Sequence, residues 1–215
     1  MSLTRQPPVR LLEPEAGEEP GLVDQLTGLI NRVYATAESG LWRDGTSRTT
    51  AIEVAELIGA GQIAVATRDG RIVGSVRIHD VADDASEFGL LVAAADQRST
   101  GVGRALLDFV EANSHRRGLR TVQLELLVPR DWSHPSKEFL KAWYGRRGYR
   151  ITRTERFDDA YPHLAPLLAT ACDLEIHQKS LRPEGQRGAG ASGAAPTRSC
   201  SGARTTRASF PSGPP

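Results

Sequence analysis

Apolar residues recur at spacings of three and four over residues 21–39 and again over residues 101–117. This spacing places the apolar side chains on one face of a helix, so both segments are predicted to be amphipathic helices. Shorter helices are predicted over residues 51–58, with Thr49 or Thr50 as the cap, and over residues 136–147. Each of these helices needs an apolar surface against which to pack.

Strands are predicted where apolar residues alternate or run together between the helices. They cover residues 8–12, 63–67, 72–78, a stretch that begins at Glu87, 121–128, 149–157 and 171–177. The pair Asp69-Gly70 favours a two-residue hairpin turn, so the strands on either side should pair antiparallel. The strand that begins at Glu87 and the strand over 121–128 should be parallel, with a right-handed crossover. Residues 13–21, 80–86 and 158–168 are expected to be loops or linkers.

The stretch from Glu87 to Arg104 joins a predicted strand to a predicted helix through a polar turn that contains Gly101 and Gly103. The first N–H groups of a helix have no partner within the helix and lie at the positive end of its dipole, so an anion is expected there. The two glycines leave room for a diphosphate, and Arg98 and Arg104 can add charged donors. The alternative is an ordinary connection whose glycines serve only the turn.

This spacing is neither that of an ATP-binding loop nor that of a dinucleotide fingerprint. Arg98-x-x-Gly101-x-Gly103 resembles the Arg/Gln-x-x-Gly-x-Gly/Ala signature of the GCN5-related N-acetyltransferase (GNAT) superfamily, whose members bind the pyrophosphate of acetyl-coenzyme A at that turn. Tyr144-x-x-x-Gly148-Tyr149 is similar to the ending of that family's fourth helix. The resemblance implies an α/β (α+β) fold with a mixed central sheet of six to seven strands flanked by about four helices, across residues 1–182.

The resemblance also implies a reaction, in which the acetyl group of acetyl-coenzyme A moves to a primary amine by direct attack in a ternary complex. The backbone of Leu91, Val92 and Ala93 would hold the pantetheine arm and the thioester carbonyl. The pyrophosphate would lie against the turn, formed by Arg98, Ser99, Thr100, Gly101, Val102, Gly103 and Arg104. Acetyl-coenzyme A is a cosubstrate in this scheme, and no metal is expected.

Two catalytic residues follow from the same resemblance. Tyr144 is expected to be the general acid that protonates the departing thiolate, since a phenol with a reference pKa of about 10 stays protonated at neutral pH. Glu87 stands where histone-type members carry their general base, and Glu125, His134 or a water molecule are the alternatives. Lys137 stands where many relatives have an Asn that contacts the pantetheine.

The acceptor amine is not identified by the sequence. The resemblance places its site between the loops over residues 40–50, 80–86 and 128–135, which vary freely in this fold. Trp42 and Arg48 lie in the first of these loops, where they would form part of the acceptor wall or simply serve the core edge and the solvated surface. Two other functions stay open: a non-catalytic module that binds or senses acyl-coenzyme A, and a transferase of a larger acyl group.

Composition narrows the classes of partner. The whole chain has a net charge of +1, and residues 183–215 contain four Arg and one Glu. The rest of the chain is therefore slightly acidic, and a nucleic-acid groove is not expected there.

No apolar run is long enough to span a membrane, which predicts a cytoplasmic protein. Cys172 and Cys200 have neither disulfide nor metal-ligand spacing. A homodimer is compatible with the resemblance.

The last residues differ in composition from the rest. Residues 183–215 are rich in Gly, Ala, Ser, Thr, Pro and Arg, with Phe210 as their single large apolar residue. Such a segment cannot bury enough apolar surface to offset the entropy of ordering, so a disordered tail is expected there.

Overall fold

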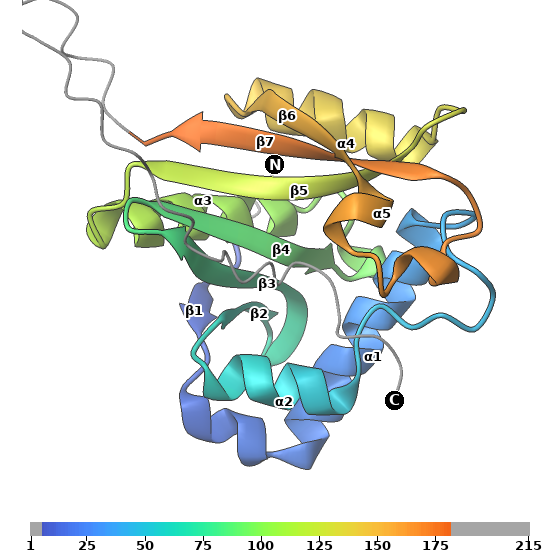
Figure 1. Cartoon of the computed structure of the whole chain (residues 1–215). Helices are drawn as coiled ribbons and strands as arrows, with labels where there is room; N and C mark the ends of the chain where they lie inside the picture. The colour runs from blue at the N-terminus through green and yellow to red at the C-terminus, as the bar shows by residue number, and fades with distance from the viewer. Residues whose placement is uncertain (1–5, 182–215) are drawn as a thin grey trace, which may run out of the picture.

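A computed structural model of the protein describes residues 6–181, which share one seven-stranded sheet with the order β1-β2-β3-β4-β5-β7-β6 (Figure 1). The strands are β1 (Val9–Leu11), β2 (Ile63–Arg68), β3 (Arg71–Ala82), β4 (Ala85–Ala93), β5 (Thr121–Pro129), β6 (Arg150–Arg156) and β7 (Cys172–Ser180). The β4–β5 pair is parallel and the other five pairs are antiparallel. The predicted mixed sheet and its hairpin are therefore confirmed.

Helices cover both faces of this sheet. They are α1 (Pro20–Ala37), α2 (Ala51–Gly59), α3 (Val102–Arg116), α4 (Pro135–Arg146) and α5 (Phe157–Ala160), with short 3-10 helices η1 (Pro14–Glu18), η2 (Ala95–Gln97) and η3 (Ala165–Leu167). Side chains alternate along β2, so that Ala64 packs with the core under α3, while Ile63 packs with the core under α1 and α2. The sheet is thus the middle layer of three (Figure 1).

The four longer helices begin and end close to the predicted limits, and their caps explain why. Thr50 is the N-cap of α2, where its Oγ1 accepts from the N–H of Glu53 at 3.2 Å and its own N–H donates to the Glu53 carboxylate at 3.0 Å. His134 caps α4 ahead of Pro135, and its side chain accepts from the N–H of Ser136. Residues close together in the sequence therefore determine where these two helices begin.

Two predicted loops proved to be partly regular. Residues 80–86 were expected to be a loop, but β3 continues to Ala82 and β4 begins at Ala85, with Asp80 paired to Ser86. Polar side chains do not prevent this pairing, because ladder hydrogen bonds are made by the backbone. The loop prediction over residues 13–21 missed η1.

The expected linker over residues 158–168 contains part of α5 and all of η3. Tyr161 and Leu164 of this segment, together with the preceding Phe157, are buried against β5 and β7 in a third apolar cluster. The segment forms a wall on the same face of the sheet as α1 because these side chains need cover. The predicted tail over residues 183–215 lies outside the described residues.

Close packing brings the start of α3 onto the sheet. A Cβ atom at Gly74 of β3 would lie 2.6 Å from Val102 Cγ1 and 2.6 Å from the carbonyl oxygen of Val92. Only glycine fits this approach. The N-terminus of α3 is consequently held against the end of β4.

Candidate active site

β4 and β5 separate along their length. They pair from Ala85 and Thr121 as far as Glu87 and Gln123, and within the described strands residues 88–93 of β4 then pair with β3 alone. The register of β4 against β3 shifts opposite Leu90, which has a φ of 47°. Such a bulge turns a strand away from its neighbour. The backbone of the second half of β4 therefore faces an opening rather than another strand.

A small cavity of about 80 Å³ lies at this opening. Gly89 and Leu91 of β4, Glu125 of β5 and Tyr144 of α4 line it together. Three more of its residues, Tyr34, Glu38 and Arg48, come from α1 and the loop that follows it. The structure thus brings predicted Tyr144 to the predicted pantetheine strand at Leu91, while Val92 and Ala93 continue the same strand.

Tyr144 is held by aromatic neighbours. Its ring centre lies 5.9 Å from that of Phe88 and 5.8 Å from that of Tyr149, and the residue is 4% exposed. Burial, together with the nearby Tyr34, raises the pKa of Tyr144 well above its usual range. The hydroxyl therefore keeps its proton at neutral pH and can act as a donor.

The turn before α3 has the geometry of an anion site. Gly101 is the N-cap with a φ of 90°, and no side chain caps the helix in the described part of the chain. The next glycine, Gly103, has ordinary helical geometry, and a Cβ built there would meet only Trp143 at 3.9 Å. The predicted residues 98–104 thus leave the first N–H groups of α3 uncovered by side chains.

Arg68 holds this turn from the β2–β3 hairpin. Its Nη1 donates to Gln97 Oε1 at 2.7 Å and its Nη2 to the Thr100 carbonyl at 3.5 Å. Thr100 Oγ1 donates in turn to the Gln97 carbonyl at 2.8 Å. The sequence did not indicate this role for Arg68, because the Asp-Gly pair locates the hairpin without showing which loop its arginine reaches.

The two carboxylates proposed as bases have different surroundings. Glu87 is buried where β4 and β5 are still paired, and its Oε2 accepts from Gln123 Nε2 at 2.7 Å. His79 Nε2 lies 3.8 Å from Glu87 Oε1, and burial, with the charge of Arg77, lowers the pKa of His79 to about 4. Glu125 lines the small cavity and accepts from the Tyr161 hydroxyl at 2.7 Å. Of the two carboxylates, it is Glu125 that shares a cavity with Tyr144.

His134, another predicted candidate for the base, contacts two segments of the chain. Its Nδ1 accepts from the N–H of Ser136 at 3.2 Å, and its Nε2 lies 3.1 Å from the Ser39 carbonyl. Both ring nitrogens are therefore engaged at the start of α4. They connect this helix to the loop that follows α1.

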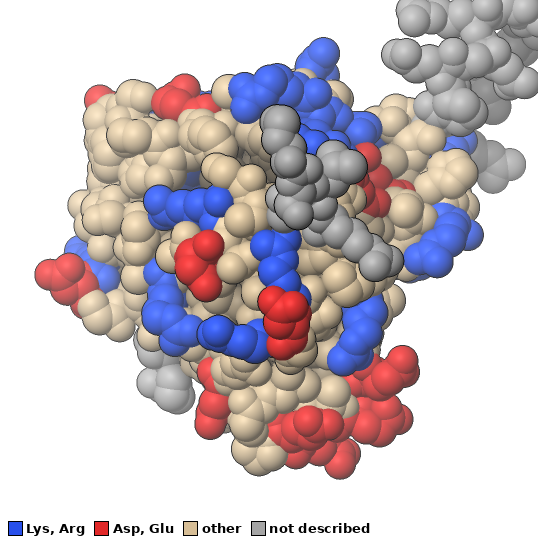
Figure 2. Space-filling view, turned by 180° about the vertical axis from the view of Figure 1, so that it is seen from behind, with Lys and Arg blue, Asp and Glu red and all other residues tan. Residues whose placement is uncertain are grey.

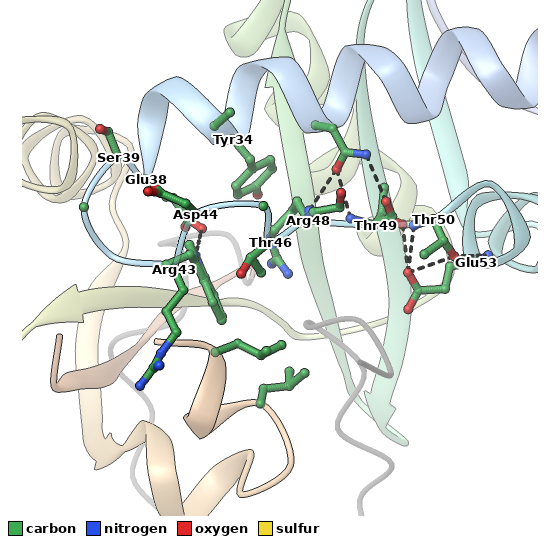
Figure 3. Close-up of a pocket in the computed structure, with 18 residues that line it drawn as sticks. Tyr34, Glu38, Ser39, Arg43, Asp44, Thr46, Arg48, Thr49, Thr50 and Glu53 are labelled. Atoms are coloured by element: carbon green, nitrogen blue, oxygen red, sulfur yellow. Dashed lines mark hydrogen bonds between the residues drawn. The ribbon is translucent and has the colours of Figure 1, made fainter. Parts of the chain in front are cut away.

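A second cavity of about 840 Å³ opens beside α1, the loop over residues 38–50 and η3 (Figure 3). Trp42 and Arg48, which the sequence placed in an acceptor wall, both line it. Trp42 Nε1 donates to Glu38 Oε2 at 2.7 Å, and the Arg48 guanidinium carbon lies 4.8 Å from the centre of the Tyr34 ring. Tyr34, Glu38 and Arg48 line both cavities, so the two meet at these side chains.

A buried ion pair stands at this junction. Lys137 Nζ lies 2.6 Å from Glu38 Oε1, and both residues are buried. Burial by itself raises the pKa of Glu38, but the charges of Lys137 and Arg48 outweigh it and hold that pKa below its ordinary value. The sequence showed that Lys137 departs from the family's Asn, and gave no sign that its partner lies in α1.

Comparisons with known proteins agree with this geometry. Residues 59–151 match the model of the acetyltransferase (GNAT) domain family, and this segment contains the turn before α3 and also Tyr144. This match identifies residues 59–151 as part of a GNAT domain. The prediction of this family and of its fold is confirmed.

Curated relatives match at low identity. The chain is 28% identical over 139 residues to an amino-acid acetyltransferase of Azotobacter vinelandii (strain DJ / ATCC BAA-1303), which covers 64% of this chain and 28% of the relative. It is 26% identical over 160 residues to an amino-acid acetyltransferase of Pseudomonas fluorescens (strain Pf0-1), which covers 74% of this chain and 32% of the relative. The chain thus spans about a third of the length of these relatives.

Solved GNAT structures share the fold. An aminoglycoside 6'-N-acetyltransferase in complex with coenzyme A superposes with a TM-score of 0.61 at 16% identity, over 83% of this chain and 99% of that one. The ribosomal-protein-S18-alanine N-acetyltransferase of Escherichia coli superposes with a TM-score of 0.56 at 15% identity, over 85% and 98%. At these identities the likeness concerns the fold alone.

Residues 6–181 lack two further features, a metal-ligand cluster and a membrane-spanning helix. No group of three His, Cys, Asp or Glu side chains in this part of the chain could hold a metal ion. None of its helices combines the length and apolar character that a membrane crossing demands. Cys172 is buried, which raises the pKa of its thiol to about 12.

Figure 2 shows basic and acidic side chains interspersed on the face opposite to that of Figure 1.

Proposed function

We propose that this GNAT protein is an acetyl-coenzyme A-dependent N-acetyltransferase. The observation that carries the proposal is the opening between β4 and β5, where Leu91 of the unpaired strand edge and Tyr144 line one cavity. That cavity meets a larger one at Tyr34, Glu38 and Arg48. A thioester and an amine could therefore approach each other from two directions.

The cosubstrate would extend from β4 to α3. The edge formed by Leu91, Val92 and Ala93 offers backbone donors and acceptors to the pantetheine arm, in the manner of an added strand. Its pyrophosphate would lie on the N–H groups at the start of α3, with Arg98 and Arg104 as charged donors at the rim. The solved GNAT relative in complex with coenzyme A supports this choice of cosubstrate.

The reaction needs one proton donor and one proton acceptor. The neutral amine attacks the thioester carbonyl carbon, a C–N bond forms and the C–S bond breaks. Tyr144 supplies a proton to the departing sulfur, and its raised pKa keeps that proton available. The proton lost by the amine passes to a carboxylate, either Glu125 in the cavity or Glu87 through a water molecule.

The acceptor would be a small amine. A cavity of about 840 Å³ has the size of sites that enclose small molecules, and it is bounded by α1, its following loop and η3. The two curated relatives are named amino-acid acetyltransferases, which makes free amino acids the first acceptors to test.

Release of free thiol from acetyl-coenzyme A, measured over a panel of amines, tests this function. Release that depends on both protein and amine supports the transferase. Tight binding of acetyl-coenzyme A in a titration, without release for any amine, would favour the non-catalytic acyl-coenzyme A-binding module. Faster release from a longer acyl thioester would favour transfer of a larger acyl group.

A further inference from the structure

Arg48 lies where the two cavities meet. It lines both of them, and its guanidinium stands 4.8 Å from the centre of the Tyr34 ring. This contact holds the guanidinium at the ring, and the N–H donors of a guanidinium match the two oxygens of a carboxylate. Arg48 is therefore held at the junction of the cavities and is suited to bind one kind of anion.

Four charged side chains line the small cavity. Glu38 and Lys137 are paired at 2.6 Å, and the charge of Arg48 also lowers the pKa of Glu38. Arg48 and Glu125 are the remaining charged side chains among the cavity's lining residues. They come from different elements, Arg48 from the loop after α1 and Glu125 from β5. The cavity is thus lined by one cationic and one anionic group in addition to the pair.

The cationic and the anionic group lie at different sides of the small cavity. Glu125 lies on the strand beside the opening, with Leu91 and Tyr144, where an amine would have to stand to reach the thioester. Arg48 lies at the side shared with the larger cavity. Arg77 is buried, and its burial together with the charge of Arg48 lowers the pKa of its guanidinium.

We propose that Arg48 binds the carboxylate of an α-amino acid acceptor, while Glu125 faces the amino group of the same molecule. This inference rests on the proposed acetyltransferase function. An α-amino acid carries its two charges on one carbon, so it can span the small cavity while its side chain extends into the larger one. Amines without a carboxylate would leave the guanidinium without this ion pair.

The wild-type protein provides the first test. The twenty α-amino acids are compared as acceptors with their α-amides and with the corresponding decarboxylated amines, by thiol release from acetyl-coenzyme A. For the preferred side chain, kcat/KM for the free acid should exceed that for the amide by about 10- to 100-fold, as a charge-assisted hydrogen bond at a partly buried site predicts. This comparison needs no variant and so no assumption about folding.

The variant Arg48→Met is the second test, with Arg32→Met, an exposed arginine of α1, as control. Arg48→Met should lower kcat/KM for the acid by about 10- to 100-fold and leave the amide unchanged within about threefold, and Arg48→Lys should recover part of the loss. Arg32→Met should behave as wild type. Coenzyme A titration and thermal melting check that each variant is folded.

The outcomes separate the two proposals. Equal rates with acids, amides and decarboxylated amines would overturn the role of Arg48 and leave the transferase intact. A preference for phosphoethanolamine over every amino acid would assign a phosphate to this site and would also overturn the carboxylate inference. An absence of thiol release with every amine would overturn the proposed function, and this inference with it.

Discussion

Lys137 of α4 donates to Glu38 at the end of α1 over 2.6 Å, and both side chains are buried. Trp42 donates to the other oxygen of the same carboxylate at 2.7 Å. The pair therefore connects the helix that carries Tyr144 to the loop that lines the larger cavity. It sets the place of the proposed general acid relative to the proposed acceptor site.

Breaking this pair should destabilise the fold. Lys137→Met removes the ion-pair partner of buried Glu38, and breaking such a pair typically costs about 3–5 kcal/mol. The double variant Glu38→Gln/Lys137→Met removes both charges and should recover most of that loss. Urea unfolding of the three proteins measures these differences. A Lys137→Met variant within about 1 kcal/mol of wild type would show that the pair contributes little.

The same pair should make stability depend on pH in the acid range. The pKa of Glu38 is lowered in the folded state below its ordinary value of 4.5, so folding favours its ionised form. Its contribution is present above the unfolded pKa and is lost as pH falls through the lowered folded pKa. The stability difference between wild type and the double variant should be constant from about pH 7 to pH 5 and should change in favour of the double variant below about pH 4.5. A difference that stays constant down to about pH 3 would contradict this assignment.

Gly103→Asp should abolish binding of coenzyme A. The substitution places a carboxylate at the start of α3, where the pyrophosphate is proposed to lie, while the backbone there is helical and the Cβ has room. Gly103→Ala is the matched control and should bind with nearly the affinity of wild type. Gly101 is less suitable for this test, because a side chain at its φ of 90° is strained in itself. Calorimetric titration measures the affinities, and unchanged binding in folded Gly103→Asp would refute the phosphate site.

Tyr144→Phe should slow turnover without weakening cosubstrate binding. The change keeps the buried ring against Phe88 and Tyr149 and removes only the proton donor. Loss of a general acid typically costs about 10²–10⁴-fold in rate. Pre-steady-state measurement of acetyl transfer shows whether chemistry is affected. A rate within about threefold of wild type, with chemistry limiting, would exclude Tyr144 as the acid.

Glu125→Gln and Glu87→Gln should differ in their pH–rate profiles. If Glu125 takes the amine proton, Glu125→Gln will lose the acid limb of the kcat/KM profile, whereas Glu87→Gln will keep it at a similar rate. Both variants retain a hydrogen-bonding side chain, for the Tyr161 hydroxyl and the Gln123 amide respectively. The reverse pattern would assign the base to Glu87, and an acid limb that survives in both would indicate water.

Features that depend on neighbouring residues could be predicted from the sequence. Three- and four-residue spacing identified the longer helices, and the Arg98-x-x-Gly101-x-Gly103 spacing identified the turn that begins α3. Each of these patterns lies within one segment, because helix periodicity, capping and turn conformation are set by residues close together in the chain. The family followed from two such local patterns.

Tertiary structure alone decided which side chains meet. Glu38 and Lys137 are 99 residues apart in sequence, and neither segment shows a pattern that selects the other. Glu125 rather than Glu87 lines the cavity with Tyr144 because β4 turns away from β5 beyond Glu87, at the bulge near Leu90. A site assembled from five elements depends on strand register and layer packing, which no single segment of the sequence encodes.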